Sequence, residues 1–315
     1  MPLQPGRFLM RQPNVEAPMT SAQGQLRPAA DIHSLDRHVP WVRYKLQKEL
    51  QLLDRRAVPA SGQVLLDVGA GWGDYLPHFV ERGFTTVALD IDPANLFRMA
   101  GVKPAGYPLH LAKADAHKLP LRDGTVDVAF MGEVLEHVVS PEEALKETYR
   151  VLRPGGRIFV DVPWWHELGH PWAAVALRCL QTYRATGKAP LLFRLLFRTN
   201  DGKTCLRGYA KPVFRALQHH PSLRGISPER FVDSYLQGDP TADYHRHFFF
   251  PGEWCRLMQG AGFRIEVVTG AWLAPSPLNR WEPSNRLFAA LERRLGDRSL
   301  SRLAQILIIE ARKPL

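Results

Sequence analysis

A glycine-rich turn follows a short apolar run early in the chain. The segment VLLDVGAGWGDY (64–75) contains Gly69, Gly71 and Gly73 between a predicted strand and a predicted helix. Glycines at such a turn permit positive φ and let a ligand approach the backbone closely. A dinucleotide site favours a third glycine where this chain has Asp74, and a carboxylate there would repel a pyrophosphate. With Asp67 just before the turn, the pattern favours a cationic ligand.

Two further acids follow the next predicted strands. Asp90 ends the second strand and lies about 20 residues beyond the turn, where nucleotide-binding α/β folds hydrogen-bond a ribose. Ile91 would then lie beside an adenine, and Asp115, which ends the third strand, could accept a hydrogen bond from the adenine amino group. Because parallel strands end at the same edge of a sheet, we expect Asp67, Asp90 and Asp115 to converge on one crevice.

The elements that would position these acids alternate between strand and helix. Apolar runs predict strands at 64–68, 85–90, 108–115, 126–131, 157–162, 264–270 and 305–312. Helical spacing of leucines, proline starts and glycine stops predict helices at 33–53, 74–82, 92–100, 140–152, 251–263 and 284–295. Ser140 followed by Pro141 is a clear helix start. This alternation predicts an α/β fold with a Rossmann-like, doubly wound sheet.

Two stretches of the chain, one at its start and one in its middle, lack this alternation. Residues 1–30 are rich in proline and small polar residues and are interpreted as a disordered tail, which leaves 31–315 as the domain. Residues 164–250 have no strand–helix rhythm and are interpreted as a mainly helical insertion after the fifth sheet strand, forming a lid or substrate region. Within it, 189–198 is a basic amphipathic stretch, which fits either a lid helix or peripheral contact with a membrane.

Charge and cysteine content restrict the function classes. The chain has 315 residues and a formal net charge of +10, yet residues 64–163 contain 14 acidic and 10 basic side chains. An acidic block inside a basic chain does not resemble a uniform nucleic-acid coat. The three cysteines are far apart in sequence, so neither a disulfide framework nor a CxxC site is predicted, and a reducing, cytoplasmic location is expected.

In combination these motifs resemble the class I S-adenosylmethionine-dependent methyltransferases, and most closely the type 11 group that includes quinone-biosynthesis enzymes. The resemblance is carried by LDVGAGWG (66–73), VALDID (87–92), ADAHKLPL (114–121), DVAFMGEVLEHV (127–138) and RVLRPGGRIFVDVP (150–163). It implies a seven-stranded sheet of order 3-2-1-4-5-7-6 with the last strand antiparallel. It also implies S-adenosylmethionine as cofactor, with its methionine end held by Asp67, Gly69, Ala70, Gly71 and Gly73. Asp90 would hold the ribose, and Asp115 with the amide of Ala116 the adenine.

The acceptor side is less defined. Glu133 and His137 follow the fourth strand and should face the mouth of the crevice, where Glu133 is a further candidate for cofactor binding. His137 is the first candidate base and His166 the second, although His137 could instead be a structural capping histidine. The segment HELGH (166–170) matches a zinc-protease pattern, but Gly169 and Pro171 disfavour the continuous helix that such a site needs, so no metal is expected.

The sequence therefore predicts an S-adenosylmethionine-dependent methyltransferase that acts on a small or lipid-linked acceptor. The residues after the fourth strand lack the tetrad that aligns a planar amino nitrogen in related enzymes, which favours an oxygen or carbon acceptor. Two alternatives stay open: an RNA methyltransferase or RNA-binding protein, and a non-catalytic relative that only binds the cofactor. RNA is disfavoured because no RNA-binding module is present. The sequence does not predict an oligomeric state.

Overall fold

The computed structural model describes residues 40–56, 62–102, 108–163, 182–183, 185–188, 247, 249–271, 281–295 and 306–315. The predicted tail at 1–30, most of the insertion at 164–250, the HELGH segment with His166 and the amphipathic stretch at 189–198 lie outside these residues. No helix in the described part of the chain is long and apolar enough to cross a membrane.

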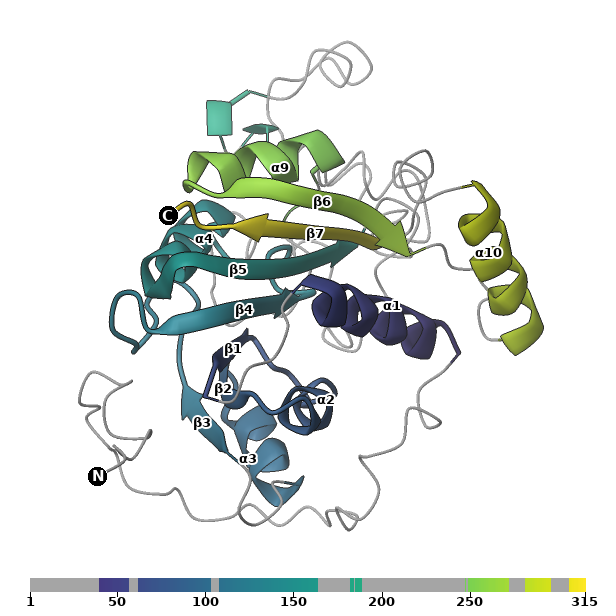
Figure 1. Cartoon of the computed structure of the whole chain (residues 1–315). Helices are drawn as coiled ribbons and strands as arrows, with labels where there is room; N and C mark the ends of the chain where they lie inside the picture. Colours follow the sequence, from purple (N-terminus) through teal and green to yellow (C-terminus); the bar gives the residue numbers. More distant parts are fainter. Residues whose placement is uncertain are drawn as a thin grey trace, which may run out of the picture.

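A seven-stranded sheet forms the centre of the molecule, in the order β3-β2-β1-β4-β5-β7-β6 (Figure 1). The strands are β1 (Val64–Val68), β2 (Thr85–Asp90), β3 (Leu109–Lys113), β4 (Val126–Gly132), β5 (Leu152–Pro163), β6 (Arg264–Ala271) and β7 (Ile306–Arg312). Strands β1 to β5 pair in parallel, whereas β7 runs antiparallel to both β5 and β6. The predicted strand order and the antiparallel last strand are confirmed.

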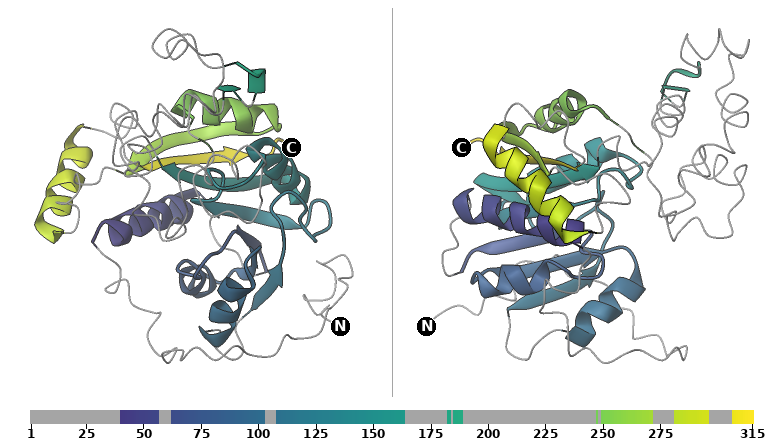
Figure 2. Two further views of the ribbon diagram at one scale, coloured as in Figure 1. Left: turned by 180° about the vertical axis from the view of Figure 1, so that it is seen from behind. Right: turned by 90° about the vertical axis from the view of Figure 1, so that its right-hand side faces the viewer.

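Helices cover both faces of this sheet (Figures 1 and 2). They are α1 (Pro40–Arg56), α2 (Leu76–Glu81), α3 (Pro93–Val102), α4 (Pro141–Val151), α9 (Pro251–Gly260) and α10 (Glu282–Leu295). On one face, buried side chains of α1 and α2 pack against strand residues such as Leu65 and Phe130. On the other, α4 and α9 pack against the alternate strand residues, such as Leu66 and Ala129. The two apolar clusters explain why the parallel strands are apolar at nearly every position.

The start of α4 shows how local sequence sets an element in place. The Ser140 side chain accepts a hydrogen bond from the backbone nitrogen of Glu143 at 3.3 Å, and Pro141 occupies the first turn. A side-chain acceptor at this position satisfies a donor that the helix itself leaves unpaired. The predicted cap is confirmed, and it fixes the entrance to α4 directly after the residues that follow β4.

Strand β5 is longer than predicted. The sequence predicts a strand at 157–162, with Pro154, Gly155 and Gly156 only ending the preceding helix. The helix does end at Val151, but Leu152 already pairs with Val126, and the strand continues to Pro163 across a register shift. Gly156 makes this possible, because a Cβ atom there would lie 2.9 Å from the carbonyl oxygen of Arg153.

Helix α1 is held firmly against the sheet. Its leucines at 46, 50 and 53 are buried on the sheet, and α10 packs against its outer side. At the end of α1, Arg56 Nε donates to Glu310 Oε2 at 2.7 Å. In the middle of the helix, Lys48 donates to the carbonyl oxygen of Gly270. Glu310 is fully buried, so losing its arginine partners would leave a costly unpaired charge. These contacts fix α1 over the carboxyl ends of β1 and β4.

Candidate functional site

The glycine turn after β1 has the backbone conformation that the sequence predicts. Gly69, Gly71 and Gly73 have φ values of 71°, 54° and 82°, all in the left-handed region that favours glycine. A Cβ atom at Gly69 would lie 2.7 Å from Val134 Cγ2. At this position the turn therefore needs glycine both for its φ and for the space beside Val134.

Four backbone amides of the turn donate hydrogen bonds to oxygen atoms of the protein itself. Gly69 and Ala70 both donate to the carbonyl oxygen of Leu89, at 2.8 and 3.0 Å, and Gly73 donates to Ala70 at 2.9 Å. Gly71 donates to Asp90 Oδ2 at 2.7 Å. A phosphate-binding turn directs free N–H groups at its anion. These four amides do not, which supports the sequence argument against a pyrophosphate ligand.

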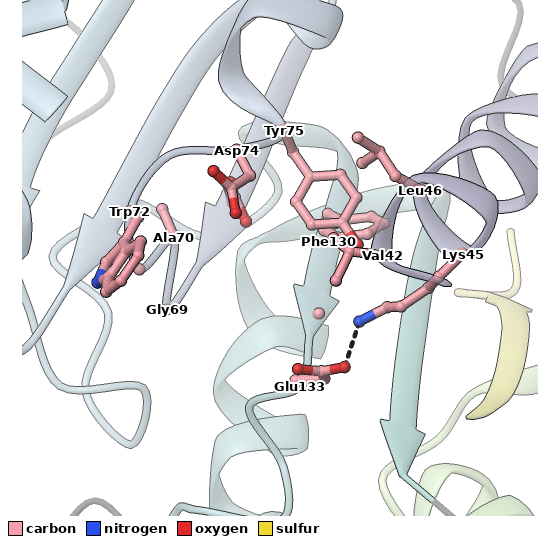
Figure 3. Close-up of a pocket in the computed structure, with 13 residues that line it drawn as sticks. Val42, Lys45, Leu46, Gly69, Ala70, Trp72, Asp74, Tyr75, Phe130 and Glu133 are labelled. Carbon is pink, nitrogen blue, oxygen red and sulfur yellow. Dashed lines mark hydrogen bonds and ion pairs between the residues drawn. The ribbon is translucent and has the colours of Figure 1, made fainter. Parts of the chain in front are cut away.

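A cavity of about 310 Å³ opens beside this turn, between β1, β4 and α1 (Figure 3). Its polar lining comes from the charged or hydroxyl-bearing residues Lys45, Asp67, Asp74, Tyr75 and Glu133. The remaining wall is backbone or apolar and consists of Val42, Leu46, Gly69, Ala70, Gly71, Trp72, Phe130 and Gly132. The cavity thus combines a glycine turn with three acids and a lysine.

Asp67 is a buried acid that lines this cavity. Its side chain lies in β1 and is 2% exposed, and its Oδ2 atom has no hydrogen-bond partner among the described residues. Burial, together with the nearby charges of Asp90, Asp161 and Asp74, raises the pKa of Asp67 to about 8. A buried carboxyl without a partner is costly unless a ligand supplies one. A cationic donor in the cavity would remove that cost.

Asp90 acts on the backbone around the turn. Besides accepting from Gly71, its carboxylate accepts from the backbone nitrogen of Asp92 at 2.8 Å and from Asn95 Nδ2 at 3.2 Å. These bonds tie the end of β2 and the start of α3 to the glycine turn. Asp90 does not line the cavity, so in this structure it stiffens the turn, and its predicted role at a ribose stays a prediction.

Asp115 is oriented by a histidine that sequence reasoning did not single out. Its Oδ1 atom lies 2.9 Å from the backbone nitrogen of His117 and 2.5 Å from His117 Nδ1. The Nε2 atom of the same ring accepts from the backbone nitrogen of Ser140 at 3.0 Å. Because Nε2 accepts, Nδ1 must carry the ring hydrogen and donate it to Asp115. Asp115 is therefore linked to the start of α4.

A charged network faces the glycine turn from α1. The Nζ atom of Lys45 lies 2.5 Å from Glu133 Oε1 (Figure 3). The same atom lies 3.0 Å from Asp161 Oδ1. Burial lowers the pKa of Lys45, but the carboxyls of Asp161 and Glu133 raise it by more, so its pKa lies well above the ordinary value. Lys45 is therefore a permanent cation on the cavity wall.

The backbone of Glu133 is strained. Its φ of 53° makes it the one non-glycine residue with positive φ in the described part of the chain. A side chain in this region costs roughly 1–2 kcal/mol, and such residues gather at functional sites. Glu133 directly follows β4, and the strained turn directs its carboxylate at Lys45 on the cavity wall.

Behind Lys45 lie further buried acids. Burial and the neighbouring Asp161 raise the pKa of Glu49 well above its ordinary value, and burial also raises the pKa of Asp161. Tyr75 donates its hydroxyl hydrogen to Glu49, and burial together with Glu49 raises the pKa of Tyr75. Tyr75 thus stays a neutral hydroxyl at the cavity. Despite these acids, no group of side chains in the described ranges could hold a metal ion.

His137 lies outside the cavity lining. Its Nε2 atom is 3.9 Å from Oε1 of Glu136, whose carboxyl is 1% exposed. Burial, and then the charge of Glu133, raises the pKa of Glu136 well above its ordinary value. The role of His137 as a base stays a prediction, and His166 lies outside the described residues.

The structure brings together about half of the predicted cofactor residues. Those that line the cavity are Asp67, Gly69, Ala70, Gly71 and Glu133. Those that do not line it are Gly73, Asp90, Ile91, Asp115 and Ala116. Sequence reasoning missed Lys45 and Tyr75. The available signal was the pair Lys45 and Glu49, one helical turn apart among leucines that must be buried.

Comparison with known proteins identifies the domain. The family model described as "Methyltransferase domain" matches residues 66–160, which run from β1 through β5 and include the glycine turn, Asp90 and Asp115. This stretch is a class I S-adenosylmethionine-dependent methyltransferase domain. The methyltransferase domain therefore supplies one wall of the cavity, and α1 supplies the other from outside the matched range.

Curated relatives agree over the same part of the chain. An uncharacterized methyltransferase of Mycobacterium ulcerans is 35% identical over 123 residues, which are 37% of this chain and 48% of the relative. The ubiquinone/menaquinone biosynthesis C-methyltransferase UbiE of Roseobacter denitrificans is 40% identical over 108 residues, 32% of this chain and 43% of UbiE. The match thus spans less than half the length of either relative.

One solved structure resembles the whole fold. It is a chain from the complex between the Haloferax volcanii Trm112 methyltransferase activator and a putative methyltransferase. The TM-score is 0.52 at 17% identity, and the alignment covers 91% of this chain and 94% of the other. At this identity the likeness shows the fold alone.

The residues of the cavity fit S-adenosylmethionine, the cofactor of this domain type. Its sulfonium and ammonium groups are cationic, and the cavity presents Asp67 with a carboxyl oxygen that lacks a partner among the described residues. The amides of Gly69, Ala70, Gly71 and Gly73 in the glycine turn donate internally, so these four do not form a cradle for an anion. Both features suit this cofactor better than a pyrophosphate-containing one.

Proposed function

We propose that the protein transfers a methyl group from S-adenosylmethionine to an oxygen or carbon atom of a small or lipid-linked acceptor. The observation that carries the proposal is the buried Asp67 carboxyl on the wall of the cavity beside the glycine turn. Its unpartnered oxygen, its pKa of about 8 and the internally used amides all favour a cationic ligand at this position.

The residues of the chain contribute mainly positioning. When bound, S-adenosylmethionine supplies a methyl carbon already activated by its sulfonium. Asp67 holds the ammonium end, and Asp90 keeps the glycine turn rigid through its bonds to Gly71 and Asp92. The Tyr75 and Phe130 rings, whose centroids are 4.6 Å apart, form an aromatic part of the cavity wall. Correct alignment of two reactants can supply much of the rate of such a displacement.

A base is needed only if the acceptor arrives with its proton. A phenol or hydroxyl acceptor must lose that proton as the new bond forms, and a side chain near the acceptor can take it. His137 and His166 are the predicted bases. The similarity to UbiE over 108 residues supports an acceptor of the quinol type, which offers both a hydroxyl and a ring carbon. Contact with a membrane through 189–198 would suit a lipid-linked acceptor and is part of the same proposal.

Ligand binding tests the cofactor part. We expect S-adenosylmethionine and S-adenosylhomocysteine, but not NADH, to bind the wild-type protein in titration calorimetry. Asp67→Asn should weaken the adenosyl compounds by about tenfold or more, because a charge-assisted hydrogen bond is lost. Asp54→Asn is the matched control, since Asp54 pairs with Arg82 on the surface. Binding of NADH, or no binding of the adenosyl compounds, would overturn the proposal.

Methyl transfer tests the acceptor part. Tritiated S-adenosylmethionine is incubated with the protein and either a prenylated hydroquinone in detergent or total RNA. We expect label in the organic extract of the hydroquinone reaction. Label in RNA, together with RNA binding that weakens steeply with salt, would favour the RNA alternative. Cofactor binding without transfer to either would favour a non-catalytic relative.

A further inference from the structure

Acidic side chains outnumber basic ones on the cavity wall. Three of its side chains are acidic, namely Asp67, Asp74 and Glu133, and Lys45 is the one cation among the described residues that line it. The amino-acid end of S-adenosylmethionine carries an ammonium group and a carboxylate. An acidic wall attracts the ammonium group and repels the carboxylate. The carboxylate therefore needs a specific partner.

Four amides of the glycine turn already donate within the protein and are not that partner. The amides of Gly69, Ala70, Gly71 and Gly73 all donate to oxygen atoms within the protein, at distances of 2.7 to 3.0 Å. Turning any of them toward a carboxylate would break one of these bonds. Breaking the bond from Gly71 would also leave Asp90 with one donor fewer beside the buried Asp67.

Lys45 can donate a hydrogen bond to the carboxylate of the ligand. A lysine ammonium group has three N–H donors. Lys45 donates one to Glu133 and forms an ion pair with Asp161. The Lys45 side chain is 7% exposed, so a carboxylate that reaches it does so in a largely dehydrated setting, where a charge-assisted bond is strong. The Glu133 side chain is 38% exposed and can yield part of its contact without becoming buried and unpaired.

The position of Lys45 is fixed by the tertiary structure. Helix α1 is held against the sheet by the contacts of Arg56 with Glu310 and of Lys48 with Gly270, and these place the backbone of Lys45 beside the cavity. In Figure 3 the ammonium group reaches from α1 toward Glu133, while the glycine turn lies on the other side of the cavity. The residue lies outside the matched range of 66–160, so the family model carries no information about it.

We propose that Lys45 binds the carboxylate of the cofactor's amino-acid end, while Asp67 binds its ammonium group from the other wall of the cavity. The proposal rests on the proposed function, because it assumes that an adenosyl amino acid occupies the cavity. It gives each charged group of the amino acid a partner of opposite sign. It also makes α1 part of the cofactor site.

Three ligands separate the two charged groups. S-adenosylhomocysteine carries both, its decarboxylated analogue keeps only the amine, and 5′-methylthioadenosine has neither. We expect the wild-type protein to bind S-adenosylhomocysteine roughly ten- to hundredfold more tightly than the decarboxylated analogue in calorimetry. In Lys45→Met this ratio should fall to about one, whereas the affinity for 5′-methylthioadenosine should stay within a few-fold of wild type.

Lys48→Met is the matched control. Lys48 lies on the same helix but contacts the carbonyl oxygen of Gly270 and not the cavity. Lys48→Met can only loosen α1. In this variant all three ligands should lose affinity together, and the affinity ratio between S-adenosylhomocysteine and its decarboxylated analogue should stay as in wild type. A ratio that persists in Lys45→Met as well would overturn the proposal.

Glu133→Gln is a second test that does not remove the lysine. Neutralising Glu133 removes a carboxylate that competes with the ligand's carboxylate for Lys45. The affinity ratio between S-adenosylhomocysteine and its decarboxylated analogue should therefore rise a few-fold. An unchanged or smaller preference would count against Lys45 even if Lys45→Met failed to fold. A different result would overturn the proposed function itself: the wild-type protein would then bind none of the three ligands.

Discussion

The Nδ1 atom of His117 lies 2.5 Å from Oδ1 of Asp115, and the Nε2 atom of the same ring accepts from the backbone of Ser140 at 3.0 Å. One imidazole therefore joins the acid after β3 to the start of α4. The arrangement requires the hydrogen on Nδ1, because Nε2 can accept only with its lone pair free.

Replacing this ring should cost stability. His117→Phe keeps a planar side chain but leaves the Ser140 amide and the Asp115 carboxylate each without one partner. We expect the free energy of unfolding to fall by about 1–3 kcal/mol in urea denaturation. His78→Phe is the control, because that ring lies 3.8 Å from Glu81 within its own helix and does not join two elements through Asp115 and Ser140. Nitrogen NMR of the wild-type ring should show hydrogen on Nδ1; a hydrogen on Nε2 would contradict the arrangement.

Two glycines with similar φ should respond differently to alanine. Gly69 has a φ of 71° and a Cβ atom there would meet Val134 at 2.7 Å, whereas Gly83 has a φ of 85° and nothing within 4 Å. Both replacements incur the cost of a left-handed conformation, about 1 kcal/mol. Gly69→Ala adds overpacking of roughly 1–3 kcal/mol. Equal losses in the two variants, measured by chemical denaturation, would show that Val134 moves aside freely.

The stability of the ligand-free protein should depend on the ionisation of Asp67. Folding raises the pKa of this acid from 3.8 to about 8, so its favourable contribution is complete below about pH 4 and is lost as the pH rises through 8. Asp67→Asn cannot ionise and escapes this loss. From pH 5 to pH 8, its free energy of unfolding should gain roughly 3–4 kcal/mol relative to wild type.

The surface variant Asp54→Asn serves as the control in the same titration. Its aspartate is exposed and paired with Arg82, so the difference from wild type should change little between pH 5 and pH 8. If Asp67→Asn followed the wild-type curve in parallel, the Asp67 carboxyl would have an ordinary pKa in the folded protein, and the desolvation argument would be wrong.

Cofactor binding should release a proton. A cationic ammonium group binds best to ionised Asp67, and below pH 8 that carboxyl is mostly protonated in the ligand-free protein. The affinity for S-adenosylhomocysteine should therefore rise by up to about tenfold per pH unit between pH 6 and pH 8 and then level off. Calorimetry in buffers of different ionisation enthalpy measures the proton directly. Asp67→Asn should show neither the rise nor the release, and a flat wild-type profile would contradict Asp67 as the ammonium partner.

Much of the fold follows from the sequence alone. The apolar runs, the glycine turn and the Ser140–Pro141 helix start are local signals, and each was placed correctly because local conformation and burial on both faces depend on nearby residues. The strand order came from the family resemblance rather than from periodicity. The length of β5 was underestimated, because the pairing of Leu152 with Val126 depends on a neighbouring strand and not on the segment itself.

Some residues of the candidate site were also predictable from the sequence, whereas others became apparent only in the structure. The sequence by itself determined the glycine turn and the acids Asp67, Asp90 and Asp115, since each lies at a strand end that local signals identify. Only the tertiary structure decided that Asp67 lines the cavity while Asp90 braces the turn, and that Lys45 reaches Glu133 across 88 positions of sequence. The physical reason is that burial and charge pairing are set by what packs nearby in space, and a helix outside the methyltransferase domain supplies that packing here.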